Sequence, residues 1–237
     1  MGNCVGSQDL KIGSIATKDE HLQHPSWNAV VDNYVYIHNA FRNHLASIRM
    51  KCEQGRDVLE EFAKWKDILD LHSRVEDEIF IPALKSRLGE DSAKIPSDIL
   101  TGEDHKVVKT LIETILNSND NAVTSLKLKE LEVELDKHLI NEETHIMPLI
   151  MDAFTTRELW ALDSFIVNPK LGYCDKDMLV VITKWWFGNL SIKEGWPLLK
   201  NFVRAGKQPE MPLEDWRKLQ DLVGPALQQF STADLVS

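Results

Sequence analysis

Two segments of the chain repeat one arrangement of histidine and glutamate. The first, "HSRVEDEIFIPAL", begins at His72, and the second, "HLINEETHIMPLI", begins at His138. In both, a glutamate follows after four residues (Glu76 and Glu142), a second acid comes next, and a proline stands ten residues after the histidine. The pattern H-x3-E-x5-P therefore occurs twice, and imidazole and carboxylate groups are common metal ligands.

A further histidine precedes each repeat at nearly the same distance. His38 stands 34 residues before His72, and His105 stands 33 residues before His138. Each half of the region thus has one candidate helix with a single histidine, followed by one with the repeated motif. This arrangement predicts two related helical hairpins.

Helix geometry predicts where these side chains point. Residues four apart on an α-helix differ by only about 40° around the axis and about 6 Å along it, so the histidine and glutamate of each motif share one face. The leucine stripe that leads to His138, with Leu128, Leu131 and Leu135, marks this face as the core side. Polar groups on such a face are costly unless something satisfies them.

Four histidines and two glutamates from four helices would therefore meet inside the protein. Carboxylates on facing helices can bridge a pair of cations, and neutral imidazole suits iron or zinc. A single buried histidine paired with a glutamate is an ordinary structural contact, but two copies with matched partners favour a dinuclear metal centre. The spacing does not decide between iron, zinc and manganese. The predicted ligands are His38, His72, Glu76, His105, His138 and Glu142.

Two more histidines lie near the predicted ligands. His145 follows His138 by seven residues, on the same predicted stripe but about 10 Å further along the axis, which is too far for the same cation. We expect it to support a ligand or to cap the helix. His44 lies about 120° around the helix from His38 and is expected at the surface.

Apolar residues at a spacing of three and four predict amphipathic helices with short connections. Ser26 is a possible N-cap of the first helix, and Gly89 stands where the second should end. Four such helices favour an antiparallel up-down-up-down bundle, so the predicted fold class is all-α. The predicted helices lie within residues 26–52, 55–89, 97–120 and 121–154, and the Asn/Ser/Asp cluster at residues 117–121 is expected to stop the third.

The predicted domains follow from these helices. Residues 1–25 are polar and interrupted by glycine, and they are expected to form a flexible leader. The metal-binding bundle takes up residues 26–153, and residues 154–237 form a helical extension that holds five of the seven tryptophans. These tryptophans are expected to pack against the bundle, although a groove for a protein partner remains open. They are Trp160, Trp185, Trp186, Trp196 and Trp216.

Composition excludes several classes of protein. The net charge of −10 and a pI near 5.3 argue against nucleic-acid binding. The three cysteines are odd in number and form no CxxC motif, which favours a reducing, cytoplasmic setting. The most apolar run, residues 178–187, is about half the length needed to span a bilayer.

The start of the chain, "MGNCVGS", resembles a signal for lipid attachment. Gly2 could be myristoylated after removal of the initiator methionine, and Cys4 could be palmitoylated, which together would anchor the protein to the cytoplasmic face of a membrane. The usual pattern has serine or threonine at position six, where this chain has Gly6. An ordinary disordered start is the alternative.

Through the paired motifs, residues 26–153 resemble the hemerythrin-like HHE cation-binding family. The resemblance implies a non-haem di-iron centre in a four-helix bundle, with Glu76 and Glu142 as bridging carboxylates and the four histidines as terminal ligands. Oxygen-carrying members have a further histidine one turn after the ligand on the third helix, where this chain has Lys109. The resemblance therefore does not extend to reversible dioxygen carriage, and water or Glu103 could take the missing position.

Within the family, the chain looks like the hemerythrin modules of plant iron-sensing RING-type ubiquitin ligases. The segments "IHNAFRNHLASI" and "WWFGNLSIKEGWPLLKNFV" carry this similarity. The RING cysteines are absent, so the resemblance does not imply ligase activity.

Three functions are consistent with these observations. The first is iron or oxygen sensing, or iron homeostasis, through the di-metal site. The second is a di-iron oxidoreductase that acts on dioxygen, peroxide or nitric oxide. The third is a helical adaptor that keeps the ligands as relics and binds a partner through its extension.

Lipid attachment is tested by the intact mass of the protein expressed in eukaryotic cells. Acylation at Gly2 and Cys4 predicts an added myristoyl mass and an added palmitoyl mass. A mass that corresponds to the unmodified chain would remove this hypothesis.

Overall fold

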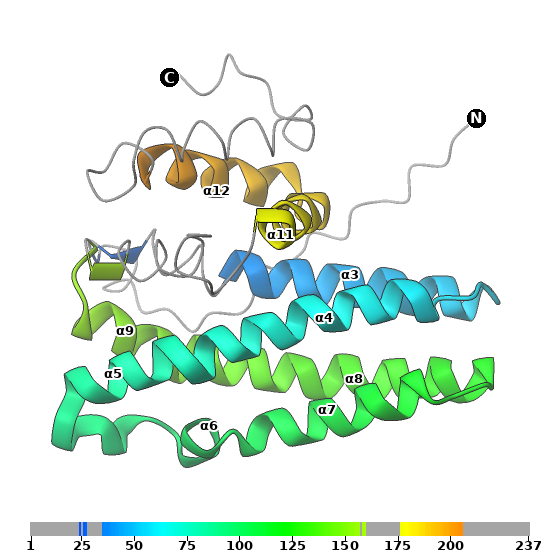
Figure 1. The fold of residues 1–237 in the computed structure, drawn as a ribbon, viewed down its shortest axis with the longest axis horizontal. Helices are drawn as coiled ribbons and strands as arrows, with labels where there is room; N and C mark the ends of the chain where they lie inside the picture. Colours follow the sequence, from blue (N-terminus) through cyan, green and yellow to red (C-terminus); the bar gives the residue numbers. More distant parts are fainter. Residues whose placement is uncertain (1–23, 25, 28–34, 157, 160–175, 206–237) are drawn as a thin grey trace.

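The computed structural model describes residues 24, 26–27, 35–156, 158–159 and 176–205 (Figure 1). Gly2 and Cys4 lie outside these residues, so their acylation stays a prediction. The helices of the bundle are α3 (Ile37–Glu53), α4 (Leu59–Val75), α5 (Ile81–Leu88), α6 (Ser97–Thr101), α7 (Glu103–Leu116), α8 (Asn121–Asn141) and α9 (Met147–Ala153). Beyond the bundle follow α11 (Lys176–Gly188) and α12 (Ile192–Ala205).

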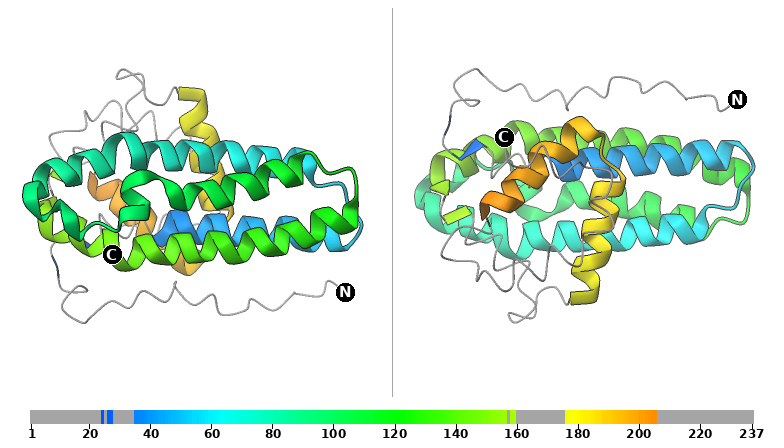
Figure 2. Two further views of the ribbon diagram at one scale, coloured as in Figure 1. Left: turned by 90° about the horizontal axis from the view of Figure 1, so that it is seen from below. Right: turned by 90° about the horizontal axis from the view of Figure 1, so that it is seen from above.

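The bundle is a ring of four antiparallel helices. α3 packs against α4, α4 against α7, α7 against α8, and α8 against α3. The chain runs up, down, up and down through these four helices (Figures 1 and 2). The described part of the chain contains no strand, so the predicted all-α fold class is confirmed. None of the described helices has both the length and the apolar character required to cross a membrane.

The third predicted helix is broken in two. A short helix, α6, ends at Thr101, and α7 begins at Glu103. Gly102 between them has a φ of 64°, in the left-handed region that costs glycine little and interrupts a right-handed helix. The prediction of one continuous helix over residues 97–120 was therefore wrong at this position.

The second and fourth helices each contain one π-helical turn, and both turns begin at a motif glutamate. These are η2 (Glu76–Phe80) and η4 (Glu142–Ile146). The N–H of Ile81 donates to the carbonyl of Glu76, and that of Met147 donates to the carbonyl of Glu142. The next residue in each case is the motif proline, which has no N–H and disturbs a regular helix. The two hairpins thus share a backbone irregularity as well as a sequence motif.

The structure shows caps at two helix ends. Asp120 caps α8, because its carboxylate accepts hydrogen bonds from the N–H groups of Ala122 and Val123. Gly89 ends α5 as predicted. Ser26 donates its hydroxyl to the carbonyl of Phe154, while the N–H groups that it was predicted to cap lie outside the described residues.

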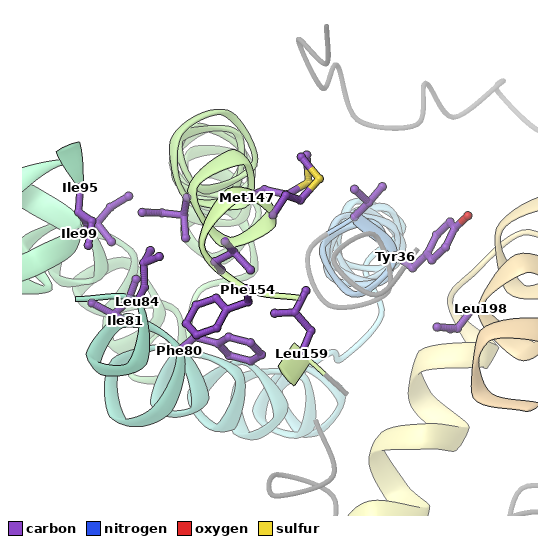
Figure 3. Packing of buried hydrophobic residues seen from close by; sticks show 14 of the residues in the cluster. Tyr36, Phe80, Ile81, Leu84, Ile95, Ile99, Met147, Phe154, Leu159 and Leu198 are labelled. Atoms are coloured by element: carbon purple, nitrogen blue, oxygen red, sulfur yellow. The ribbon is translucent and has the colours of Figure 1, made fainter. Parts of the chain in front are cut away.

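Two apolar clusters form the core, with the motif residues between them. The central cluster fills the middle of the bundle between α3, α4, α7 and α8. It includes Phe41, Phe62, Trp65, Leu128 and Leu135. The end cluster lies at the end of the bundle where α5, α9 and the start of α3 meet. It includes Tyr36, Phe80, Leu84, Met147 and Phe154 (Figure 3). Along α3, α4 and α8 the predicted ligand residues lie between the two clusters. These ligand residues therefore form a polar layer inside an apolar core.

Helices α11 and α12 lie against the outside of the bundle, and α11 crosses above α3 (Figure 2). The indole of Trp185 packs on Phe41 with ring centroids 4.6 Å apart and ring planes tilted by 47°, and its N–H donates to Nδ1 of His44 at 2.7 Å. Trp186 and Trp196 pack against the end cluster. These three tryptophans pack as expected, whereas Trp160 and Trp216 lie outside the described residues.

His44 is not the surface residue that its helical position indicated. Its side chain is 12% exposed, because Trp185 covers it, and its Nε2 lies 3.0 Å from Oε1 of Glu61. An indole N–H can only donate, so Nδ1 of His44 must accept, and the proton of the neutral ring sits on Nε2, facing Glu61. The extension therefore decides both the exposure and the tautomer of this histidine.

Docking of α11 is expected to weaken in acid. Burial lowers the pKa of His44 from its usual value, although Glu61 opposes this shift. As the pH falls below about 6.5, His44 is protonated in the unfolded chain but not yet in the folded chain. The free energy of unfolding therefore declines. Below the folded pKa, a proton on Nδ1 displaces the Trp185 N–H.

The indole N–H signal of Trp185 in NMR spectra, followed from about pH 7 to about pH 5, measures this change. His44→Gln keeps an acceptor that does not titrate in this range, and should leave the signal constant. An equal pH dependence in wild type and His44→Gln would contradict the prediction.

Candidate metal centre

The structure brings all six predicted ligands together at one level of the bundle. His38 comes from α3, His72 from the end of α4, His105 from α7 and His138 from the end of α8. Glu76 and Glu142 begin the two π-helical turns. Each of the four bundle helices therefore contributes to the cluster.

The six side chains form two groups that share both glutamates. The first group is His38, His72, Glu76 and Glu142, and the second is His105, His138, Glu76 and Glu142. Within each group, one ligand atom from every residue lies within 4.8 Å of the others. Two histidines and two shared carboxylates on each side are a suitable donor set for a pair of cations bridged by carboxylates.

The histidine Nε2 atoms point inward. Nε2 of His38 lies 3.2 Å from Nε2 of His72 and 3.5 Å from a carboxylate oxygen of Glu142. In the second group, the ring centroids of His105 and His138 are 4.8 Å apart, and Nε2 of His138 lies 3.6 Å from Glu142. Nitrogen and oxygen atoms therefore face a common centre from opposite sides.

Burial keeps the histidines of the first group neutral. His38 is fully buried and His72 is 9% exposed. Desolvation lowers the pKa of His38 well below its usual value, and Arg42 and His138 add to the effect. Desolvation, with the nearby His38, His138 and His105, likewise lowers the pKa of His72. A neutral imidazole has a free nitrogen lone pair, which is the form that binds a metal.

The second acid of each motif lies behind a histidine of the other hairpin. Glu143, which follows Glu142, places Oε1 2.9 Å from Nδ1 of His38. Asp77, which follows Glu76, places Oδ2 3.4 Å from Nδ1 of His105. A carboxylate on the outer nitrogen fixes the orientation and tautomer of a metal-binding histidine. The sequence showed these acids as part of the repeat, but it did not indicate which histidine each would contact.

The two supporting acids differ in their surroundings. Glu143 is 1% exposed and accepts a hydrogen bond of 2.7 Å from Arg42, whereas the side chain of Asp77 is 47% exposed. Burial raises the pKa of Glu143, and the guanidinium of Arg42 opposes this shift. The first group is therefore held more firmly and is more enclosed than the second, in which the side chain of His105 is 21% exposed.

Two predicted supporting residues lie elsewhere. His145 is exposed, and its Nδ1 lies 3.0 Å from the carbonyl oxygen of Asn141 in its own helix. The π-helical turn changes the phase of the helix, so a count of 3.6 residues per turn from His138 misplaces His145. Glu103 is exposed and pairs with Lys106. The carboxylates that support histidines of the cluster are instead those of Glu143 and Asp77.

A hemerythrin HHE cation binding domain model matches residues 29–150 of the chain. The chain belongs to the hemerythrin HHE family. The hemerythrin match spans the bundle and all six clustered side chains, and it identifies a cation-binding domain. It carries no information on the likeness to plant ubiquitin ligases. Neither a curated protein nor a solved structure matches this chain.

Removal of one histidine should affect one cation, and removal of a shared glutamate should affect both. His105→Ala leaves the first group complete, so the metal content after loading with ferrous iron should fall to about half of the wild-type value. Glu142→Gln removes a carboxylate from both groups, and its metal content should fall further.

Elemental analysis measures the metal content, and circular dichroism checks the fold of each variant. Glu103→Gln changes an exposed acid near His105 and serves as a control with full metal content. Equal losses in His105→Ala and Glu142→Gln would contradict two groups that share Glu142.

Proposed function

We propose that this hemerythrin domain binds a pair of iron ions and works in iron sensing or iron homeostasis. The observation that carries the proposal is that Glu76 and Glu142 belong to both ligand groups. Each is 3% exposed and lies within a layer that is otherwise lined by histidine. Such a centre needs carboxylates that reach both cations, and here each repeat supplies one.

The six ligand residues and Glu143 would have different roles at this centre. His38 and His72 would hold one cation, and His105 and His138 would hold the other. Glu76 and Glu142 would hold both and offset their charge. Bound iron supplies redox chemistry and coordination positions for small ligands. Glu143 would accept a hydrogen bond from the Nδ1–H of His38, and this would leave the lone pair of the inner Nε2 available.

Iron binding would be linked to the stability of the bundle. Two carboxylates in an apolar interior cost several kcal/mol per ion unless they are compensated. Without iron, repulsion between the carboxylates of Glu76 and Glu142 would destabilise the bundle where α4 and α8 end. With iron, the same charges hold the four helices together, so the fold itself would report iron availability.

Ferrous iron should raise the melting temperature of the protein under anaerobic conditions. Iron at about 100 times its dissociation constant stabilises a one-site protein by about 2.7 kcal/mol, which raises the melting temperature of a domain of this size by roughly 5 to 10 °C. Thermal unfolding followed by circular dichroism, with and without iron, measures the shift.

Two variants sharpen this test. Glu142→Gln should lose most of the shift, because it breaks both ligand groups. His145→Ala removes an exposed histidine outside the cluster and should keep the whole shift. An unchanged melting temperature of the wild-type protein would rule out sensing through the fold. Metal analysis that finds zinc alone in protein purified without a chelator would rule out iron as the native metal.

A further inference from the structure

A buried glutamate of the extension lies between α12 and α3. Glu194 is 3% exposed, and its Oε2 accepts hydrogen bonds from the backbone N–H of Ser191 at 2.9 Å and from its hydroxyl at 2.6 Å. Its Oε1 accepts a hydrogen bond of 2.8 Å from the side-chain amide of Asn39. A buried carboxylate needs such partners, and here they join the start of α12 to α3.

Asn39 connects this carboxylate to a partly buried cation, Arg42. Its amide nitrogen donates to Glu194, and its amide oxygen accepts a hydrogen bond of 3.2 Å from Nη1 of Arg42. Asn39 is itself 3% exposed. Both ends of the amide are engaged, so the position of Asn39 depends on the extension on one side and on Arg42 on the other.

Arg42 continues the connection to the metal centre. Its Nη1 donates to Oε1 of Glu143 at 2.7 Å, and its Nε donates to Asp136 at 2.7 Å. Burial lowers the pKa of Arg42, but Glu143 and Asp136 outweigh this effect and raise it above the usual value, so the side chain stays charged. Oε1 of Glu143 also lies 2.9 Å from Nδ1 of His38. The hydrogen bonds therefore run without a gap from Glu194 to a ligand of the first group.

We propose that Glu194 is a positioning residue for the metal centre and acts on His38 through Asn39, Arg42 and Glu143. The extension is then part of the metal-binding unit, although the family match ends at residue 150. This proposal rests on the proposed function, since it requires that His38 binds a cation. Outer partners of metal-binding histidines typically change metal affinity by about 10-fold to 100-fold.

The coupling works in both directions. If docking of α12 raises the affinity for iron by some factor, iron must favour docking of α12 by the same factor. A cation on Nε2 of His38 makes the Nδ1 proton a stronger donor to Glu143. That change fixes Glu143 and Arg42 more firmly, and with them the amide that holds Glu194.

Asn43 provides a matched control. It lies one turn after Asn39 on α3 and also holds the extension, because its amide donates to the carbonyl oxygen of Asn189 at 2.9 Å. Its acceptor is a backbone carbonyl at the end of α11, whereas Asn39 reaches Glu194 and Arg42. Asn43→Ala and Asn39→Ala therefore each remove one bond to the extension, but only the second interrupts the path to His38.

The test measures ferrous iron affinity of the full chain by anaerobic competition with a chromophoric chelator. Asn39→Ala and Glu194→Gln are expected to weaken the tighter iron site by about 10-fold, and Asn43→Ala is expected to leave it unchanged. The double variant of Asn39 and Glu194 should lose no more affinity than either single variant, because both changes break one path. Circular dichroism checks that each variant is folded.

Hydrogen exchange provides a readout that a purely structural role would not change. Iron should slow exchange in the first turn of α12 in the wild-type protein. Asn43→Ala should speed exchange with and without iron but keep the difference that iron makes, whereas Asn39→Ala should lose that difference. In cobalt-loaded protein, the shifted NMR signal of the Nδ1 proton of His38 should move in Asn39→Ala and stay in place in Asn43→Ala.

The outcomes separate this proposal from the proposed function. If wild-type protein binds iron and exchange in α12 is the same with and without it, the role of Glu194 is refuted and the metal site stands. Equal losses of affinity in Asn39→Ala and Asn43→Ala would also refute it. If wild-type protein binds no iron, the proposed function fails and the role of Glu194 fails with it.

Discussion

Two buried carboxylates, Glu76 and Glu142, set the main physical constraint on this structure. They lie between two apolar clusters, at the level where all four helices supply a clustered histidine. A carboxylate in such a place is unfavourable without a compensating positive charge. Burial lowers the pKa values of His38 and His72, which therefore offer lone pairs rather than positive charge, so bound cations would supply the compensation. Stability and metal binding would then depend on the same side chains.

The repeated motif serves both halves of the centre at once. Within a motif, the glutamate contributes to both ligand groups, and the acid after it approaches a histidine of the opposite hairpin. This exchange ties the hairpins together through polar contacts as well as through apolar packing. The two halves are nevertheless unequal, because Glu143 is buried and bonded to the partly buried Arg42, while Asp77 is half exposed. The pseudo-symmetric sequence therefore produces one enclosed site and one that lies closer to solvent.

The extension changes the picture of a bundle that stands alone. Its contacts with α3 are of two kinds: Trp185 packs on Phe41, which in turn lies 5.2 Å from the ring of His72, and Glu194 closes a chain of hydrogen bonds that ends at His38. Both kinds of contact reach a ligand of the enclosed site. Aromatic packing attaches the extension to the bundle, and the hydrogen bonds fix where α12 lies along α3.

The sequence by itself determined the bundle and the six clustered side chains, because helix geometry converts a spacing of four residues into a shared face. It did not reveal the π-helical turns at Glu76 and Glu142, and so it misplaced His145. It also could not assign Glu143 to His38 or bring Glu194 next to Asn39, which lies 155 residues away. Spacing along one helix is a local property, whereas such partners depend on how separate helices pack. Only the tertiary structure decided them.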